Sequence, residues 1–140
     1  MDITKRIKQK RGQDTIAGIL PGAASASVTD VARSFGLLDS SECYEEIDAV
    51  EAAKVIENVL HRDMAYNTEI MPFSLARELS GEFVAAFAGS DARFFTNGEW
   101  GRSNGALGVG WTPVTSATFD TGVLVVSDQT VGCVWCMDED

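Results

Sequence analysis

The sequence predicts an α+β domain in which N-terminal helices pack on a C-terminal antiparallel β-sheet. Segments with helical periodicity lie between residues 27 and 87, whereas segments rich in β-branched and aromatic residues follow from residue 93. The last segment, residues 118–140, contains two apolar runs joined by a polar turn, which is the pattern of a β-hairpin. We therefore expect three main helices on a sheet of four or five strands.

The expected terminal hairpin is the part that the rest of the chain must cover. Its strands are residues 123–126 and 131–137, and residues 127–130 have turn chemistry. Neither run alternates cleanly between apolar and polar residues, which predicts central strands with both faces at least partly buried. A helical layer is therefore required on one face.

Length and composition bound the class of protein. A chain of 140 residues has the length of one domain and can bury a core without disulfides or metals. We expect a basic arm over residues 1–13 and a single domain over residues 14–140. No apolar run approaches the ~18 residues of a membrane helix. Three cysteines cannot all pair within the chain, which favours a reducing, cytoplasmic compartment.

Charge is unevenly distributed along the chain. The formal net charge is −10, and five of the eleven basic residues lie in the first eleven positions. From residue 12 onward, six basic residues face twenty acidic ones, a net charge of −14. Such a body repels phosphates and anionic lipid and attracts basic surfaces. We expect a basic protein partner, and neither nucleic acid nor membrane.

The N-terminal segment resembles a secretory signal only in outline. A basic head is followed by an apolar patch at residues 15–20 and small residues at 24–26, but six apolar residues fall below the usual minimum of about seven. We expect instead a frayed or helical arm in which Ile3 and Ile7 share a face, ending before Pro21.

Residues 27–36 predict the first main helix, with Ser27 as N-cap, Asp30 at the third position and Gly36 as the stop. The segment resembles the first helix of a helix-turn-helix. However, its recognition helix would come from residues 37–48, which hold five acids and no Lys or Arg. Because phosphates would repel such a helix, we expect an ordinary capped core helix.

Residues 48–63 predict a second helix, capped by Asp48, with one apolar and one polar face. His61-Arg62-Asp63 at its end resembles a kinase catalytic loop, but Asn67 is one residue too close and the other kinase motifs are missing. We expect His61 to be a surface partner of Glu57, one turn earlier.

A third helix is predicted over residues 74–87, with Ser74 as its N-cap. Gly81 inside it costs about 1 kcal/mol relative to Ala, which close packing would explain. Farther on, Asn97-Gly98 predicts a tight turn and hence a hairpin. Residues 101–110 predict a plain surface loop, because they lack the Lys-Ser or Lys-Thr ending of a phosphate-binding loop.

Cys133 and Cys136 form a Cys-x-x-Cys pair, and together with Cys43 and His61 they have the composition of a three-Cys-one-His zinc site. On a strand, residues three apart point to opposite faces, so the two sulfurs of the Cys-x-x-Cys pair do not converge. We therefore expect buried cysteines, and we predict no metal and no cofactor.

No catalytic residue is predicted. His61, the sole histidine, has no serine or cysteine partner in a recognisable nucleophile elbow. Asp120, in a mostly apolar strand, is the one acid whose ionisation burial could perturb. A small enzyme with an acidic pocket near Asp120 or His61 therefore stays as an alternative.

Aromatic residues beside carboxylates in the second half of the chain suit recognition of a basic protein surface. Trp135 is expected to face the interior, and Trp100, near the predicted turn, is the better anchor. The predicted partner-binding residues are Glu99, Trp100, Asp120, Asp128, Asp138, Glu139 and Asp140, with a second acidic cluster at Glu42, Glu45 and Glu46.

A small acidic α+β domain without a catalytic constellation resembles bacterial immunity proteins that neutralise polymorphic or contact-dependent growth-inhibition toxins. The resemblance is carried by size, by the charge of residues 12–140, and by the segments TFDTGVLVV and GCVWCMDED. It implies a stoichiometric inhibitor that covers the active cleft of a basic toxin such as a nuclease. A phage-type inhibitor of a host nucleic-acid enzyme is the alternative.

Overall fold

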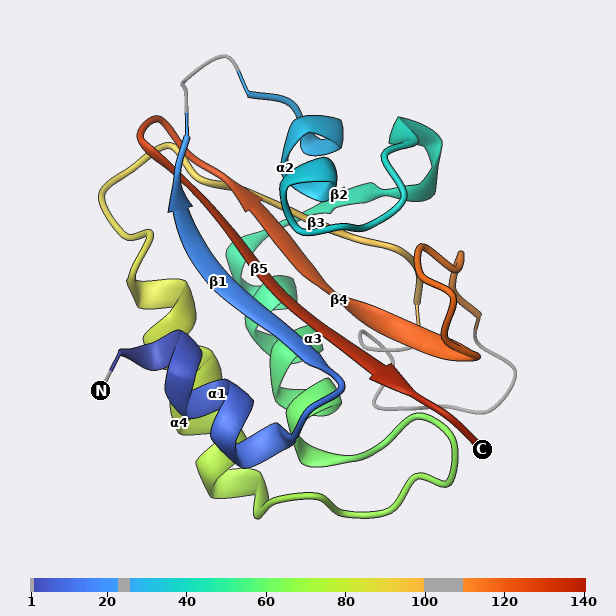
Figure 1. The fold of residues 1–140 in the computed structure, drawn as a ribbon. Helices are drawn as coiled ribbons and strands as arrows, with labels where there is room; N and C mark the ends of the chain where they lie inside the picture. Colours follow the sequence, from blue (N-terminus) through green and yellow to red (C-terminus); the bar gives the residue numbers. More distant parts are fainter. Residues whose placement is uncertain (1, 23–25, 100–109) are drawn as a thin grey trace.

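The computed structural model describes residues 2–22, 26–99 and 110–140, and it confirms the α+β class. Within these residues the helices are α1 (Ile3–Arg11), α2 (Val28–Ser34), the 3₁₀ turn η1 (Ser41–Cys43), α3 (Ala49–His61) and α4 (Phe73–Ala85). The strands are β1 (Thr15–Pro21), β2 (Glu45–Ile47), β3 (Arg93–Thr96), β4 (Phe119–Val126) and β5 (Thr130–Asp138). They form one antiparallel sheet in the order β1-β5-β4-β3-β2 (Figure 1).

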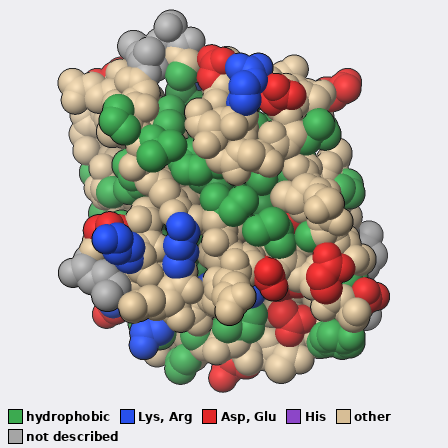
Figure 2. Space-filling view, viewed as in Figure 1, with side chains coloured by type: hydrophobic (Ala, Val, Ile, Leu, Met, Phe, Trp, Pro, Cys, Tyr) green, Lys and Arg blue, Asp and Glu red, His purple; other side chains and the backbone are tan. Residues whose placement is uncertain are grey.

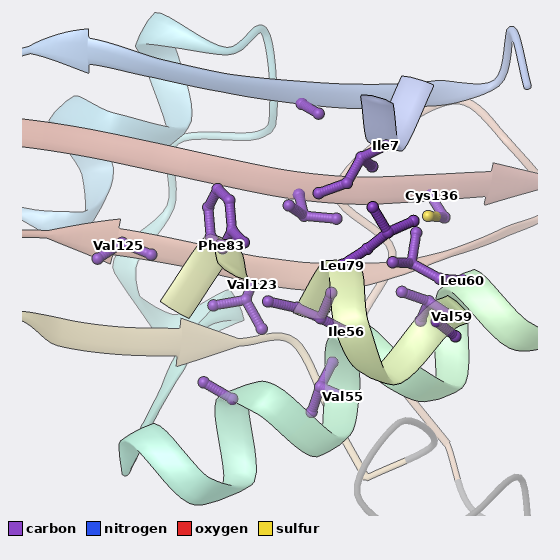
Figure 3. Close-up of a cluster of buried hydrophobic side chains, with 14 of the residues drawn as sticks. Ile7, Val55, Ile56, Val59, Leu60, Leu79, Phe83, Val123, Val125 and Cys136 are labelled. Carbon is purple, nitrogen blue, oxygen red and sulfur yellow. The ribbon is translucent and has the colours of Figure 1, made fainter. Parts of the chain in front are cut away.

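Helices cover both faces of the sheet. On one face, α1, α3 and α4 build the larger core, where side chains such as Ile56, Leu79 and Phe83 gather against Val123 and Val125 (Figure 3). On the other face, α2 and the segments around it cover the side chains of β4 and β5 that point the opposite way. The two central strands are therefore buried on both faces, as their unbroken apolar runs predict.

The terminal hairpin forms at the predicted position. The Ser127 N–H donates to the Thr130 carbonyl at 3.0 Å and closes the turn. Gly122 lies opposite Trp135, where a Cβ would come within 2.0 Å of the Val134 carbonyl oxygen. The close approach of the two backbones therefore requires glycine at position 122.

The N-terminal segment differs from the expectation after residue 12. Asp2 caps α1, and Ile7 is fully buried in the larger core, so the face shared with Ile3 packs on the domain. The chain then turns at Gly12, whose φ is +117°, and residues 15–21 pair with β5 as an edge strand. A helical arm reaching to Pro21 is therefore wrong, because β5 supplies a backbone ladder for the short apolar run.

The helix caps confirm two of the three predicted helix starts. Ser27 forms a capping box with Asp30, and Asp48 accepts from the Glu51 N–H at 2.8 Å. The third start is wrong, since the N-cap of α4 is Pro72, two residues before the predicted Ser74, and Ser74 makes no capping bond. Residues 37–48 form η1 and β2 in place of a second helix of a helix-turn-helix.

Two local predictions are overturned by contacts with distant segments. His61 does not pair with Glu57; its Nδ1 lies 2.8 Å from the Met71 carbonyl oxygen and 3.9 Å from the Glu69 carboxylate. Asn97-Gly98 is not a tight turn either, because Gly98 bridges to Trp111. Residues 101–109, most of the predicted loop, lie outside the described residues.

Gly81 lies in open space, so close packing does not explain it. A Cβ added there meets no atom within 4 Å. We expect Gly81→Ala to raise the free energy of unfolding by about 0.5–1 kcal/mol, because alanine lowers the conformational entropy of the unfolded chain. Urea denaturation measures this change. Gly122→Ala is the contrasting control and should destabilise the fold. A loss of stability in Gly81→Ala would contradict the conclusion that position 81 has room for a Cβ.

Candidate functional site

The structure separates the predicted partner-binding residues into distinct places. Residues 138–140 lie at the end of β5. Glu99 follows β3 and lies at the same end of the sheet, because β3 runs antiparallel to β4 and therefore ends toward the start of β4, which pairs with the end of β5. Asp128 lies in the β4–β5 turn, at the opposite end. Glu42, Glu45 and Glu46 lie on or beside the edge strand β2. Trp100 lies outside the described residues.

Asp120 is fully buried, so its prediction as a partner-binding residue is wrong. Its carboxylate accepts hydrogen bonds from Asn97 Nδ2 at 3.1 Å, Thr115 Oγ1 at 2.9 Å and Trp135 Nε1 at 3.1 Å. The backbone N–H groups of Val114 and Thr115 also donate to it. The carboxylate therefore acts inside the fold, where it ties residues 114–115 to the central strands.

Asp138 is also internal, and this corrects its predicted role. Its side chain is 10% exposed and forms an ion pair of 2.8 Å with Arg11, whose side chain is 4% exposed. The same carboxylate accepts from the Met64 N–H at 2.9 Å, while Arg11 Nε donates to the Val59 carbonyl at 2.6 Å. This bridge joins the ends of α1, α3 and β5.

Exposed and half-buried carboxylates surround this bridge. The acidic end, as we name it, consists of Asp14, Asp63, Tyr66, Glu139 and Asp140. Met137 N–H donates to the Asp14 carbonyl at 2.9 Å, which holds the start of β1 beside the end of β5. The segment after α3 passes next to the end of β5 in Figure 1, and red carboxylates gather in the same region of Figure 2.

Two of these carboxylates are held in place by hydrogen bonds. Asp63 accepts from the Tyr66 and Thr68 N–H groups at 2.6 and 3.1 Å, which shapes the loop. Glu139 accepts from both the hydroxyl and the N–H of Thr118, and these bonds lower its pKa. Glu139 is therefore charged at neutral pH and has a fixed direction.

Tyr66 is the residue that the sequence reasoning missed. Its side chain is 67% exposed, although large aromatic side chains are usually at least half buried. Tyrosine is enriched among the residues that dominate binding energy in protein interfaces. A single tyrosine in a loop belongs to no periodic sequence pattern. Only its position three residues after Asp63 distinguished it in the sequence.

Partly buried apolar side chains lie next to the acidic end, on the sheet face that α2 covers. Ile16, Phe35 and Tyr44 pack against the smaller core and stay partly exposed, and Figure 2 shows green side chains across the middle of this face. Tyr44 packs edge-on against Trp135, with ring centroids 6.1 Å apart. Trp135 itself is fully buried, as predicted.

The acidic cluster at β2 is partly neutralised within the protein. Arg93 donates to Glu46 at 2.8 Å, and this hydrogen bond lowers the pKa of Glu46. Other arginines are also paired internally: Arg6 with Glu78 and Glu82, and Arg33 with Asp30 and Asp39. At the acidic end, Arg11 pairs with Asp138 and also interacts electrostatically with Asp63.

The two strand cysteines lie in different cores, as the strand geometry predicts. Cys133 belongs to the smaller core and Cys136 to the larger one, and burial raises the pKa of both thiols, that of Cys136 to about 11. Within the described residues, no group of three or more His, Cys, Asp or Glu side chains is placed to hold a metal ion.

Surface hollows formed by described residues have volumes of about 270 to 570 Å³. Neither Asp120 nor His61 lines any of these hollows. In the part of the chain that the structure describes, no helix has the length and apolarity needed to cross a bilayer. Comparison with protein-family models, curated proteins and solved structures finds no match.

Proposed function

We propose that this protein is a stoichiometric, cytoplasmic protein-binding inhibitor that docks its acidic end on a basic protein. Most concretely, it would be an immunity protein that covers the active cleft of a bacterial toxin such as a nuclease. The observation that carries the proposal is the exposed Tyr66 among carboxylates from separate segments of a protein with a net charge of −10.

Inhibition would occur by occlusion. A nuclease holds its phosphate substrate with Lys and Arg side chains, and carboxylates at the acidic end would form charge-assisted hydrogen bonds with these cations. The long-range field of the inhibitor would accelerate encounter with the basic cleft. Once docked, the inhibitor would exclude the nucleic acid from the cleft.

The surface has the composition of a binding interface with an aromatic anchor and a polar rim. Tyr66 would supply the buried contact, and Glu139 and Asp140 would supply the charged rim. The buried bridge between Arg11 and Asp138 holds the supporting segments together, so little ordering is needed on binding. The apolar face near Ile16 and Tyr44 offers additional contact area.

The test is binding of the protein encoded by the adjacent gene, measured by co-purification and calorimetry. We expect Tyr66→Ala to weaken binding by ~30-fold, the effect of a hot-spot residue. Asp140→Asn should mainly slow association at low salt. The matched control is Asp128→Asn, which removes one exposed carboxylate at the opposite end of the sheet and should leave affinity unchanged.

Salt dependence separates electrostatic docking from other binding. Raising salt to about 0.5 M should weaken the complex, because exposed charges are screened within a few ångströms at that concentration. If no protein binds tightly, and such salt leaves any weak binding unaltered, the electrostatic inhibitor is refuted. Equal losses of affinity for Asp140→Asn and Asp128→Asn would show that the acidic end is not the contact surface.

A further inference from the structure

The strand β1 is one edge of the sheet, and its backbone shows which groups it directs away from the sheet. In the part of the chain that the structure describes, β1 pairs only with β5, and it borders the sheet in Figure 1. Just before β1, the Asp14 carbonyl accepts from the Met137 N–H at 2.9 Å, and just after it, the Gly22 N–H donates to the Gln129 carbonyl at 2.9 Å. Because bonding alternates along an antiparallel pair, the even-numbered residues of this segment bond to β5, and the odd-numbered ones point outward.

The outward backbone groups belong to Thr15, Ala17 and Ile19. Among the described residues, no group forms a hydrogen bond with the outward N–H or C=O of these three residues. The side chains of Ala17 and Ile19 pack in the larger core, so these residues present their backbone at the edge. A row of unpaired N–H and C=O groups is a template for one more extended strand.

β1 also lacks the features that protect sheet edges from pairing. Edge strands of soluble proteins are usually short, charged or interrupted. β1 has seven residues without a charged side chain, its one proline is the last residue, and Leu20 is 40% exposed. The opposite edge strand, β2, has three residues and carries Glu45 and Glu46. Of the two edges, β1 is therefore the one suited to pairing.

A second copy of this chain supplies a matching edge. With a two-fold axis beside Ala17, Ala17 pairs with Ala17 of the second copy, and Thr15 pairs with Ile19 of the second copy. Every outward N–H of the three residues then meets an outward carbonyl, and Pro21, which has no N–H, stays outside the ladder. The same edge on both molecules satisfies itself, as an interface with two-fold symmetry requires.

Hollows along β1 favour an identical strand over a foreign peptide. A peptide that adds to a sheet edge gains specificity from pockets for its alternate side chains. The hollows of described residues that touch β1 are lined by Thr15 at its start and by Pro21 at its end. The middle of the strand thus offers backbone recognition, which a second β1 provides in full.

Net charge opposes self-association, but antiparallel pairing keeps the two acidic ends apart. Each copy has a net charge of −10. The acidic end lies at the start of β1, and pairing about Ala17 places Asp14 of one copy opposite Leu20 of the other. The two Asp14 residues are then roughly 20 Å apart along the strands. This exceeds the Debye length of about 8 Å at physiological salt, so the repulsion is largely screened.

We propose that β1 pairs antiparallel with β1 of a second copy, so that the two sheets become one across a two-fold axis. The paired segment contains no residue of the acidic end. The dimer therefore does not depend on the proposed inhibitor function, and each copy keeps its acidic end available.

Sedimentation velocity of the full chain tests self-association. The contact is one strand wide, so we expect a weak dimer, with the mass rising from 15.0 kDa toward twice that value between about 10 μM and about 1 mM protein. Raising salt from about 50 mM to about 0.5 M should tighten the dimer at least threefold, because repulsion between the copies is screened. Salt has the opposite expected effect on docking of the acidic end to a basic protein, so the two proposals fail separately.

Amide hydrogen exchange followed by NMR locates the contact. Dimerisation should slow exchange at least tenfold at Thr15, Ala17 and Ile19, whose N–H groups gain partners. The Ile16 and Gly18 amides, which already bond to β5, should be protected at every protein concentration.

Ile19→Pro removes one outward N–H and leaves the bonds to β5 intact, a position where an edge strand tolerates proline. We expect this variant to weaken the dimer at least tenfold. Ile19→Ala is the matched control: it loses the same side-chain packing but keeps the N–H, and it should still dimerise. Circular dichroism checks that both variants fold.

Charges at position 20 test the register without altering the backbone. Leu20→Glu places a carboxylate opposite Asp14 of the second copy and should weaken the dimer at least tenfold, whereas Leu20→Lys should dimerise more tightly than Leu20→Glu. The control is Leu38→Glu, because Leu38 is 51% exposed and lines a hollow away from β1; it should change the dimer affinity less than about twofold.

Four results would overturn the proposal. They are a monomer at about 1 mM in both salts, a dimer without added protection at Thr15, Ala17 and Ile19, a folded Ile19→Pro variant that dimerises like the unaltered chain, and a dimer that high salt weakens. Protection of these amides by a different protein, and not by a second copy, would assign the edge to a foreign strand.

Discussion

Arg11→Met is expected to lower the free energy of unfolding by about 3–5 kcal/mol, because it leaves the Asp138 carboxylate buried without its cation. The replaced guanidinium is 4% exposed and bonds both to Asp138 and to the Val59 carbonyl. Methionine fills much of the same volume, so the loss reports the unpaired charge more than a cavity. Urea denaturation followed by circular dichroism measures the effect.

The double variant Arg11→Met/Asp138→Leu tests this explanation. Removing both charges together should recover a large part of the lost stability, since a buried ion pair replaced by apolar groups is often close to neutral. The control is Arg33→Met, whose partners lie at the surface, with an expected change below about 1 kcal/mol. A loss as small as that of the control would show that the bridge does not hold these segments together.

Asp120→Asn is expected to cost about 3 kcal/mol, because it removes a charged acceptor and brings an N–H group toward donors. The buried carboxylate accepts from Asn97, Thr115, Trp135 and the Val114 N–H, so an amide leaves some of these donors unpaired. Denaturation measures the loss. Hydrogen exchange should also accelerate at the Val114 and Thr115 amides.

The surface variant Asp128→Asn is the control for Asp120→Asn and should change stability by less than about 0.5 kcal/mol. Unchanged exchange at residues 114 and 115, with unchanged stability, would mean that Asp120 does not hold this segment. Unchanged exchange with a loss of stability would assign the effect to the central strands alone.

The hairpin of β4 and β5 and the starts of α2 and α3 could be predicted from local sequence. Ser27 and Asp48 cap their helices through contacts three residues away, and the β4–β5 turn closes within four residues. By contrast, β1 was missed because its only neighbour in the sheet is β5, more than a hundred residues later. A six-residue apolar run carries no signal for such a distant partner.

For the candidate site, composition predicted the negative charge but not its distribution. Asp120 and Asp138 look like the other acids of their segment, yet their partners come from residues far away in sequence and bury them. Tyr66 became a candidate only because the segment after α3 lies beside the end of β5. Exposure is a property of the packed chain and not of residue type.

By itself, the sequence determined the α+β class, the doubly buried central hairpin and the excess of acids, because these depend on periodicity, local bonds and composition. Only the tertiary structure decided which acids are internal, that α1 and β1 join the domain, and where Tyr66 and Leu20 are exposed. The physical reason is that burial and ion pairing depend on contacts between distant segments, and no local pattern specifies those contacts.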